Sequence, residues 1–117
     1  MKYLEETEPI ILSGVWSDSS HPDRVIKIYQ FIDFIIFKMA DDTIGSAKTK
    51  GIIGCGDILE VIWSQVISHQ NRTSGAVHRT LIKVLDDKQL ELVDDTVLEA
   101  GKPVMHMNGL GKWVRKR

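Results

Sequence analysis

Cysteine is almost absent from this sequence of 117 residues. The single cysteine, Cys55, has no second cysteine to pair with, so a disulfide-rich scaffold is excluded. Because Cys55 lies between two glycines in an apolar run, we expect it to be a buried and unreactive thiol.

An excess of basic charge and a long apolar run are lacking as well. The chain has 15 Lys and Arg against 16 Asp and Glu, whereas a nucleic-acid-binding domain is usually basic. No stretch approaches the roughly 20 apolar residues of a membrane-spanning helix. Residues 1–9 contain Glu5, Glu6 and Glu8 and no apolar signal core. We therefore expect a cytoplasmic protein whose partners include neither nucleic acid nor a membrane.

The composition that is present is that of a globular protein. Hydrophobic residues make up 43% of the chain and charged residues 26%. A chain of this length ordinarily folds as one domain around one core. We expect an N-terminal extension at residues 1–9 and a single domain at residues 10–117.

Short apolar runs rich in Ile, Val and aromatic residues alternate with turn-forming residues, a pattern typical of β-strands. The runs lie at residues 10–16, 25–32, 34–39, 77–85, 89–93, 96–99, 104–107 and 111–117. The glycine-spaced segment 51–56 suggests a further strand with bends. Turns are expected at Asp41-Asp42, at 86–88, at Asp94-Asp95, at 101–103 and at Asn108-Gly109.

Residues 58–67 fit two patterns. As a strand, the segment places Leu59, Val61, Trp63 and Ile67 on one face. As a helix, which would cover residues 57–69 and make the protein α+β, it has a different apolar stripe. Its many β-branched residues favour the strand.

These features predict an all-β protein, namely a small antiparallel up-and-down β-barrel of about eight to nine strands. Short connections favour pairing of neighbouring strands, and no helical segments alternate with the strands as in a parallel sheet. Closing the sheet into a barrel removes its exposed edges. About eight strands enclose an interior that holds side chains or one small ligand.

Two motifs at opposite ends of the chain resemble the calycin superfamily, which includes lipocalins and fatty-acid-binding proteins. Gly14 and Trp16 form a Gly-x-Trp motif in the first expected strand, and Arg115 follows Trp113 in the last. The resemblance implies a lipocalin-like barrel in which Trp16 lies at the closed end and Arg115 packs across its ring. A guanidinium over an indole is worth roughly 0.5–2 kcal/mol and would join the first strand to the last.

Several residues are candidates for lining a ligand cavity inside such a barrel. The aromatic candidates are Tyr29, Phe37, Trp63 and Trp113, and the polar ones are Glu60 and His78. Glu60 interrupts the strongest apolar run, so it marks a pocket if its face points inward and is a solvated residue if its face points outward.

No motif in the sequence indicates a catalytic centre, a metal or a cofactor. The four histidines show no close ligand spacing, and no Gly-x-Ser-x-Gly motif is present. We expect no catalytic residues, no metal ligands and no cofactor.

Three functions remain open at this point. The first is binding of a small, largely apolar ligand inside the barrel, without catalysis. The second is an interaction or structural role with a filled core, exerted through the surface or as a homodimer, for which apolar residues at 25–39 would be suitable. The third is an acid–base enzyme that uses Glu60 or His78 in the same barrel.

Overall fold

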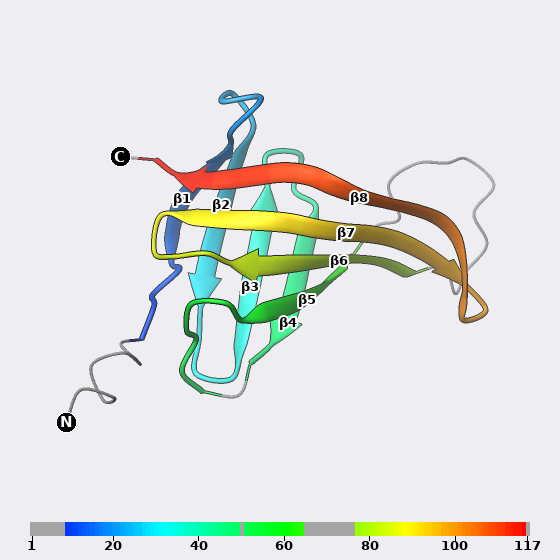
Figure 1. The fold of residues 1–117 in the computed structure, drawn as a ribbon, viewed down its shortest axis with the longest axis horizontal. Helices are drawn as coiled ribbons and strands as arrows, with labels where there is room; N and C mark the ends of the chain where they lie inside the picture. The colour runs from blue at the N-terminus through cyan, green and yellow to red at the C-terminus, as the bar shows by residue number, and fades with distance from the viewer. Residues whose placement is uncertain (1–8, 50, 65–76, 117) are drawn as a thin grey trace.

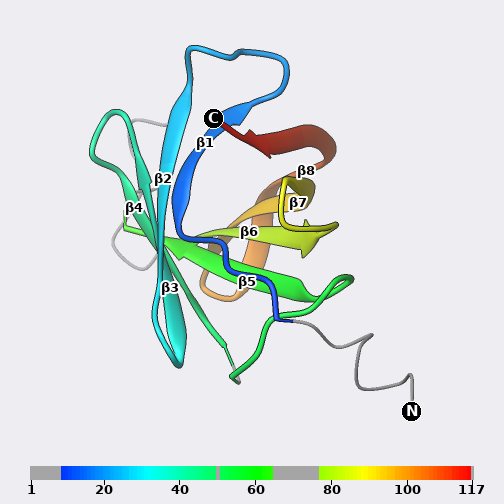
Figure 2. The ribbon, with the colours of Figure 1, turned by 90° about the vertical axis from the view of Figure 1, so that its left-hand side faces the viewer.

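The chain folds into a closed antiparallel β-barrel whose eight strands follow one another around the ring in sequence order (Figure 1). The computed structural model describes residues 9–49, 51–64 and 77–116. The strands are β1 (Gly14–Asp18), β2 (Val25–Gln30), β3 (Phe34–Met39), β4 (Ile44–Lys48), β5 (Ile58–Trp63), β6 (Val77–Val84), β7 (Gln89–Glu99) and β8 (Lys102–Arg115). Strand β1 pairs with β8 and closes the ring (Figure 2). The expected all-β antiparallel barrel is confirmed.

Strand β5 decides between the two patterns that its sequence fits. Its side chains alternate strictly, with Leu59, Val61 and Trp63 buried and the three residues between and before them exposed. A period of two belongs to a strand and not to a helix. The helical alternative is therefore wrong through Trp63, and residues 65–69 of that alternative lie outside the described residues.

Inward-facing side chains from all eight strands form one hydrophobic core. Two residues from outside the strands, Leu12 and Ile53, are buried with them. The backbone N–H of Ile10 donates to the carbonyl oxygen of Ile53 at 2.9 Å, which holds the two segments together. The barrel end at which β1 begins is thus filled by apolar side chains.

The seam between β1 and β8 lies at this filled end. Trp16 pairs with Arg115 across the seam, and the Arg115 guanidinium carbon lies 4.7 Å from the centroid of the Trp16 ring. The indole N–H of Trp16 donates to the carbonyl oxygen of Leu12 at 2.9 Å. Gly14 has a φ of 147°, and a Cβ there would lie 2.6 Å from Nη1 of Arg115. The three residues that the family resemblance places at closure therefore meet here.

Several local expectations are wrong, although the strand number is right. Strand β4 was not expected, and the glycine-spaced segment 51–56 is a connection and not a strand. Asp94-Asp95 does not turn the chain but lies within β7, beside a β-bulge where the register with β8 shifts. Asn108-Gly109 lies within β8. Continuous pairing of β7 with both neighbours overrides the turn preference of these residues.

Cys55 is exposed, and its thiol donates to the carbonyl oxygen of Leu85 at 2.8 Å, so the expectation of a buried thiol is wrong. The connection that carries Cys55 runs over the surface, as connections generally do. In the described part of the chain no helix has the length and apolar character needed to cross a lipid bilayer.

Candidate functional site

A cavity of about 130 Å³ lies toward the barrel end at which β3 and β5 finish, opposite the end at which β1 begins. Side chains from five strands line it: Met39, Trp63, His78, Thr80, Leu92, Asp95 and Trp113. Most of this wall is apolar, and the polar groups gather on β6 and β7. A pocket with apolar walls and a few placed polar groups is the usual form of a small-molecule site.

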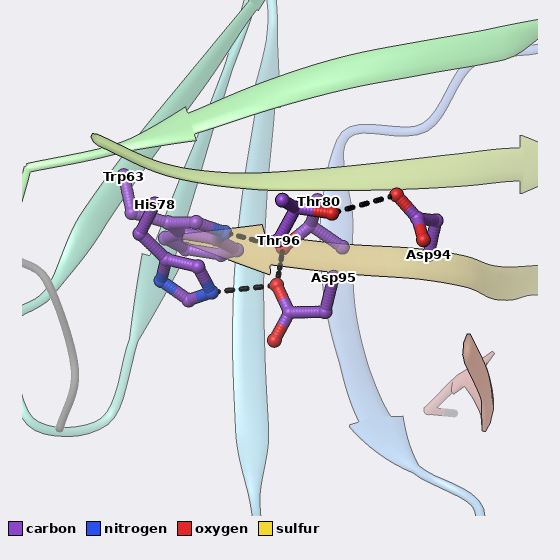
Figure 3. Close-up of polar contacts among 6 residues, drawn as sticks. All are labelled: Trp63, His78, Thr80, Asp94, Asp95 and Thr96. Atoms are coloured by element: carbon purple, nitrogen blue, oxygen red, sulfur yellow. Dashed lines mark hydrogen bonds and ion pairs between the residues drawn. The ribbon is translucent and has the colours of Figure 1, made fainter. Parts of the chain in front are cut away.

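The polar groups form one hydrogen-bonded chain that ends on Asp95 (Figure 3). The indole N–H of Trp63 donates to Thr80 Oγ1 at 2.8 Å, and the Thr80 hydroxyl donates to Asp95 Oδ1 at 2.7 Å. Nε2 of His78 lies 2.6 Å from the same Asp95 oxygen. The strand register explains why these four side chains lie together, because Trp63 is paired with His78 and Thr80 is paired with Asp95. We call these four residues the polar corner.

Asp95 is ionised at neutral pH in this setting. Partial burial by itself would raise the pKa of the Asp95 carboxyl, but the hydrogen bonds from His78 and Thr80 and the charge of His78 outweigh it and lower the pKa below 3.8. An ionised carboxylate only accepts hydrogen bonds, so Nε2 of His78 carries the proton that is shared with Oδ1.

Replacing Asp95 by Asn tests this account of the polar corner. A carboxyl whose pKa is lowered on folding adds stability that is complete above its unfolded value of 3.8 and is lost as pH falls through the folded value. We expect Asp95→Asn to lower the free energy of unfolding by about 1–2 kcal/mol at pH 7. The gap from wild type should shrink below about pH 4 in urea titrations. A gap that stays constant from pH 7 to pH 3 contradicts the account.

The second ring nitrogen of His78 has no partner in the described part of the chain. The residue is only 6% exposed, and Nδ1 is buried without a hydrogen bond. The ring lies against Trp63, with centroids 6.1 Å apart. When the imidazole is neutral, the proton on Nε2 leaves Nδ1 with an unused lone pair.

A second His–Asp pair lies beside the first but outside the cavity lining. Asp94 precedes Asp95 on β7, and its Oδ1 bonds Nε2 of His106, while its Oδ2 accepts a hydrogen bond from the Thr96 hydroxyl at 3.0 Å. Consecutive residues of a strand point to opposite faces. Asp94 therefore carries the same charge as Asp95 at nearly the same place without facing the cavity.

Four of the six predicted ligand residues lie in or next to this cavity. Trp63, His78 and Trp113 line it. Phe37 is fully buried beneath them, with its ring centroid 6.4 Å from that of Trp63 and 6.2 Å from that of Trp113.

The other two predicted residues point out of the barrel. Tyr29 is 44% exposed on β2, and Glu60 is exposed on β5, where its carboxylate pairs with Arg79 at 3.3 Å. The interior placement of both is wrong because their neighbours Ile28 and Leu59 take the inward face. A strand can bury only alternate residues.

Four lining residues were not predicted from the sequence, namely Met39, Thr80, Leu92 and Asp95. Thr80 carried a signal, since it lies at the same alternate positions of β6 as Ile82 and Val84, on the buried face. Asp95 carried a misleading one, because an Asp-Asp pair is typical of a turn.

A larger but shallow, open hollow of about 580 Å³ lies on the outside of the filled end, between the segment 9–11, residues 30–32 and the connection at 51–53. Its lining is almost wholly apolar and includes Ile32, which is 85% exposed. No titratable side chain lines it. Elsewhere among the described residues, no group of three His, Cys, Asp or Glu side chains is arranged to hold a metal ion.

Comparison of the chain with models of known protein families, with curated protein sequences and with solved structures found no match.

Proposed function

We propose that the protein binds a small molecule with a largely apolar body in the cavity between Trp63 and Trp113, without catalysis. The observation that carries the proposal is an apolar cavity whose one polar corner contains a buried, unpartnered nitrogen, Nδ1 of His78. A buried polar atom left without a bond costs free energy. A ligand that reaches this atom through a shift of the His78 ring would remove that cost, so the site favours occupation.

The size of the cavity limits the ligand to a few heavy atoms. Drug-sized ligands usually need roughly 300–1,000 Å³, and a cavity of about 150 Å³ is enough for benzene. The 130 Å³ between the two indoles fits a short chain or a single small ring. Burial of this body against Trp63, Trp113 and Leu92 would supply affinity.

The closure of the barrel is compatible with the calycin resemblance and supports the proposal that a ligand binds inside the barrel. Trp16 and Arg115 lie at the filled end, and the cavity lies toward the opposite end. We propose that the protein is a lipocalin-like carrier whose ligand enters from the end away from Trp16. A cytoplasmic location belongs to the same proposal.

Filling the cavity tests the proposal directly. Leu92→Trp places a larger side chain in the wall, and we expect it to abolish ligand binding while leaving the protein folded. Wild type should be stabilised by compounds from a library of small amines, alcohols and acids in a thermal-shift assay, because a ligand that binds only the folded state raises its stability. The variant should show no such shift.

The control is Ile58→Trp, which adds the same side chain at an exposed position on the outer face of β5. It should keep every thermal shift seen with wild type. The proposal is wrong if no compound stabilises the wild-type protein, or if both Trp variants respond alike.

The same samples address the two alternatives predicted from the sequence. Native mass spectrometry reports a homodimer by its mass, and a dimer without any cavity ligand would favour the interaction role. The acid–base alternative rests on the bond between His78 and Asp95, by which a carboxylate can orient an imidazole. Turnover of a library compound by wild type, lost in Leu92→Trp, would favour that alternative.

A further inference from the structure

The hydrogen-bond donors of the polar corner are occupied by bonds within it, whereas some of its acceptor atoms are not. Trp63 donates to Thr80, Thr80 donates to Asp95, and Nε2 of His78 donates to Asp95. Two of these bonds, from Thr80 and His78, end on the same carboxylate oxygen, Oδ1 of Asp95, and the third ends on Thr80 Oγ1 (Figure 3). None of these three side chains has a donor left for a ligand when the imidazole is neutral.

Two polar atoms remain without a partner at the same place, and both are acceptors when the imidazole is neutral. Oδ2 of Asp95 accepts no hydrogen bond from the described residues, and Asp95 lines the cavity. Nδ1 of His78 also lacks a partner among these residues. A carboxylate oxygen is the stronger acceptor, because hydrogen bonds to an ionised group are roughly twice as strong as neutral ones.

The charged and aromatic groups of the cavity also favour a ligand with hydrogen-bond donors and a positive charge. The lining contains one acidic side chain, Asp95, and one basic group, His78, which is already bonded to Asp95 Oδ1, and no Lys or Arg. Two indole faces, Trp63 and Trp113, form much of the remaining wall. An indole face attracts a cation through its quadrupole, and a carboxylate attracts it through its charge.

We propose that the ligand is a small organic ammonium ion whose short apolar body lies between Trp63 and Trp113 and whose N–H groups bond Oδ2 of Asp95. This inference rests on the proposed ligand binding and names the chemical class. A carboxylate ligand is disfavoured, because its negative charge would face that of Asp95. The remaining N–H group of the lining, the Trp113 indole, makes no bond with the polar corner, so an anion held there would be a different outcome of the test.

Four probes of equal chain length separate these possibilities: n-butylamine, 1-butanol, 1-chlorobutane and butyrate. Each is titrated into the wild-type protein at pH 7 and followed by the indole signals of Trp63 and Trp113 in proton–nitrogen correlation spectra. We expect butylamine to saturate the shift at a concentration at least about tenfold lower than butanol requires, since only the amine combines a charge with its donors. We expect butyrate and chlorobutane not to saturate the shift in that range.

Two neighbouring aspartates provide a matched pair of variants. Asp95→Asn removes the charge in the cavity and should reduce the preference for butylamine over butanol to less than about threefold. Asp94→Asn removes the same charge one residue away, outside the lining, and should leave the preference unchanged.

The outcomes are distinct for the two proposals. If butyrate or chlorobutane binds as tightly as butylamine, or if Asp94→Asn abolishes the preference as Asp95→Asn does, the ammonium inference is wrong and ligand binding stands. If none of the four probes shifts the indole signals and no library compound stabilises the protein, ligand binding itself is wrong. The wild-type series decides the inference even if Asp95→Asn fails to fold.

Discussion

Replacing Arg115 by Met is expected to lower the free energy of unfolding by about 2–4 kcal/mol. The guanidinium lies over Trp16 and donates to three carbonyl oxygens, those of Ser13 at 2.9 Å, Ile11 at 2.6 Å and Asp87 at 2.8 Å. These carbonyls belong to the segment before β1 and to the connection between β6 and β7. One side chain therefore joins the first strand, the last strand and a third segment of the barrel.

The stability lost on replacing Arg115 should depend on the geometry of the guanidinium as well as on its charge. Arg115→Lys keeps the positive charge, but an ammonium cannot reach three carbonyls with the planar fork of a guanidinium. We expect Lys to recover less than half of the lost stability. Urea unfolding at pH 7 measures both variants, and Lys112→Met, on the exposed part of the same strand, serves as the control. An Arg115→Met protein within about 0.5 kcal/mol of wild type would show that the seam holds without this residue.

Gly45→Ala is the second substitution with a large expected effect. Gly45 is buried on β4 and is paired with Trp63 on β5. A Cβ at this position would lie 2.6 Å from Cε3 of Trp63 and 2.7 Å from Cγ1 of Val61. Neither neighbour is the end of a flexible chain, so the indole must move. Overpacking of this kind costs about 1–3 kcal/mol.

The displacement should also reach the ligand site. Trp63 forms a wall of the cavity and donates to Thr80, so moving its ring breaks the first bond of the polar corner. We expect Gly45→Ala to lose probe binding and to shift the near-ultraviolet circular dichroism of the indoles. Gly54→Ala is the control, because a Cβ there has no heavy atom within 4 Å. Normal binding by the Gly45→Ala protein would contradict this role of Gly45.

Neither expectation about Gly45 was available from the sequence, in which this glycine follows a break between apolar runs. Its small size matters only because β4 and β5 are neighbours, and β4 itself was missed. The run Ile44–Lys48 contains Gly, Ser and Ala, which have little strand preference. Pairing with Phe37 and its neighbours on β3 makes it a strand.

Asp95 shows that local sequence preference also failed to predict a residue of the cavity itself. By local preference an Asp-Asp pair ends a strand, and the acidic pair at 86–87 does lie in such a connection. At 94–95 the chain instead continues between β6 and β8 with a bulge, and Asp95 reaches His78 and Thr80. The most important polar residue of the cavity was therefore identified only from the structure.

What the sequence determined by itself is the class of structure and its closure. Many short β-branched runs, with too few helical segments to cover a parallel sheet, indicated an antiparallel β protein. A Gly-x-Trp motif in the first strand and an Arg in the last, which resemble those of a family in which Trp and Arg meet, indicated the closure. What only the tertiary structure decided is which face of each strand points inward, and therefore that Trp63 and His78 line a cavity while Tyr29 and Glu60 do not. The physical reason is the period of two. Both faces of a strand are equivalent along the chain, and only the register of its neighbours and the closing of the ring distinguish them.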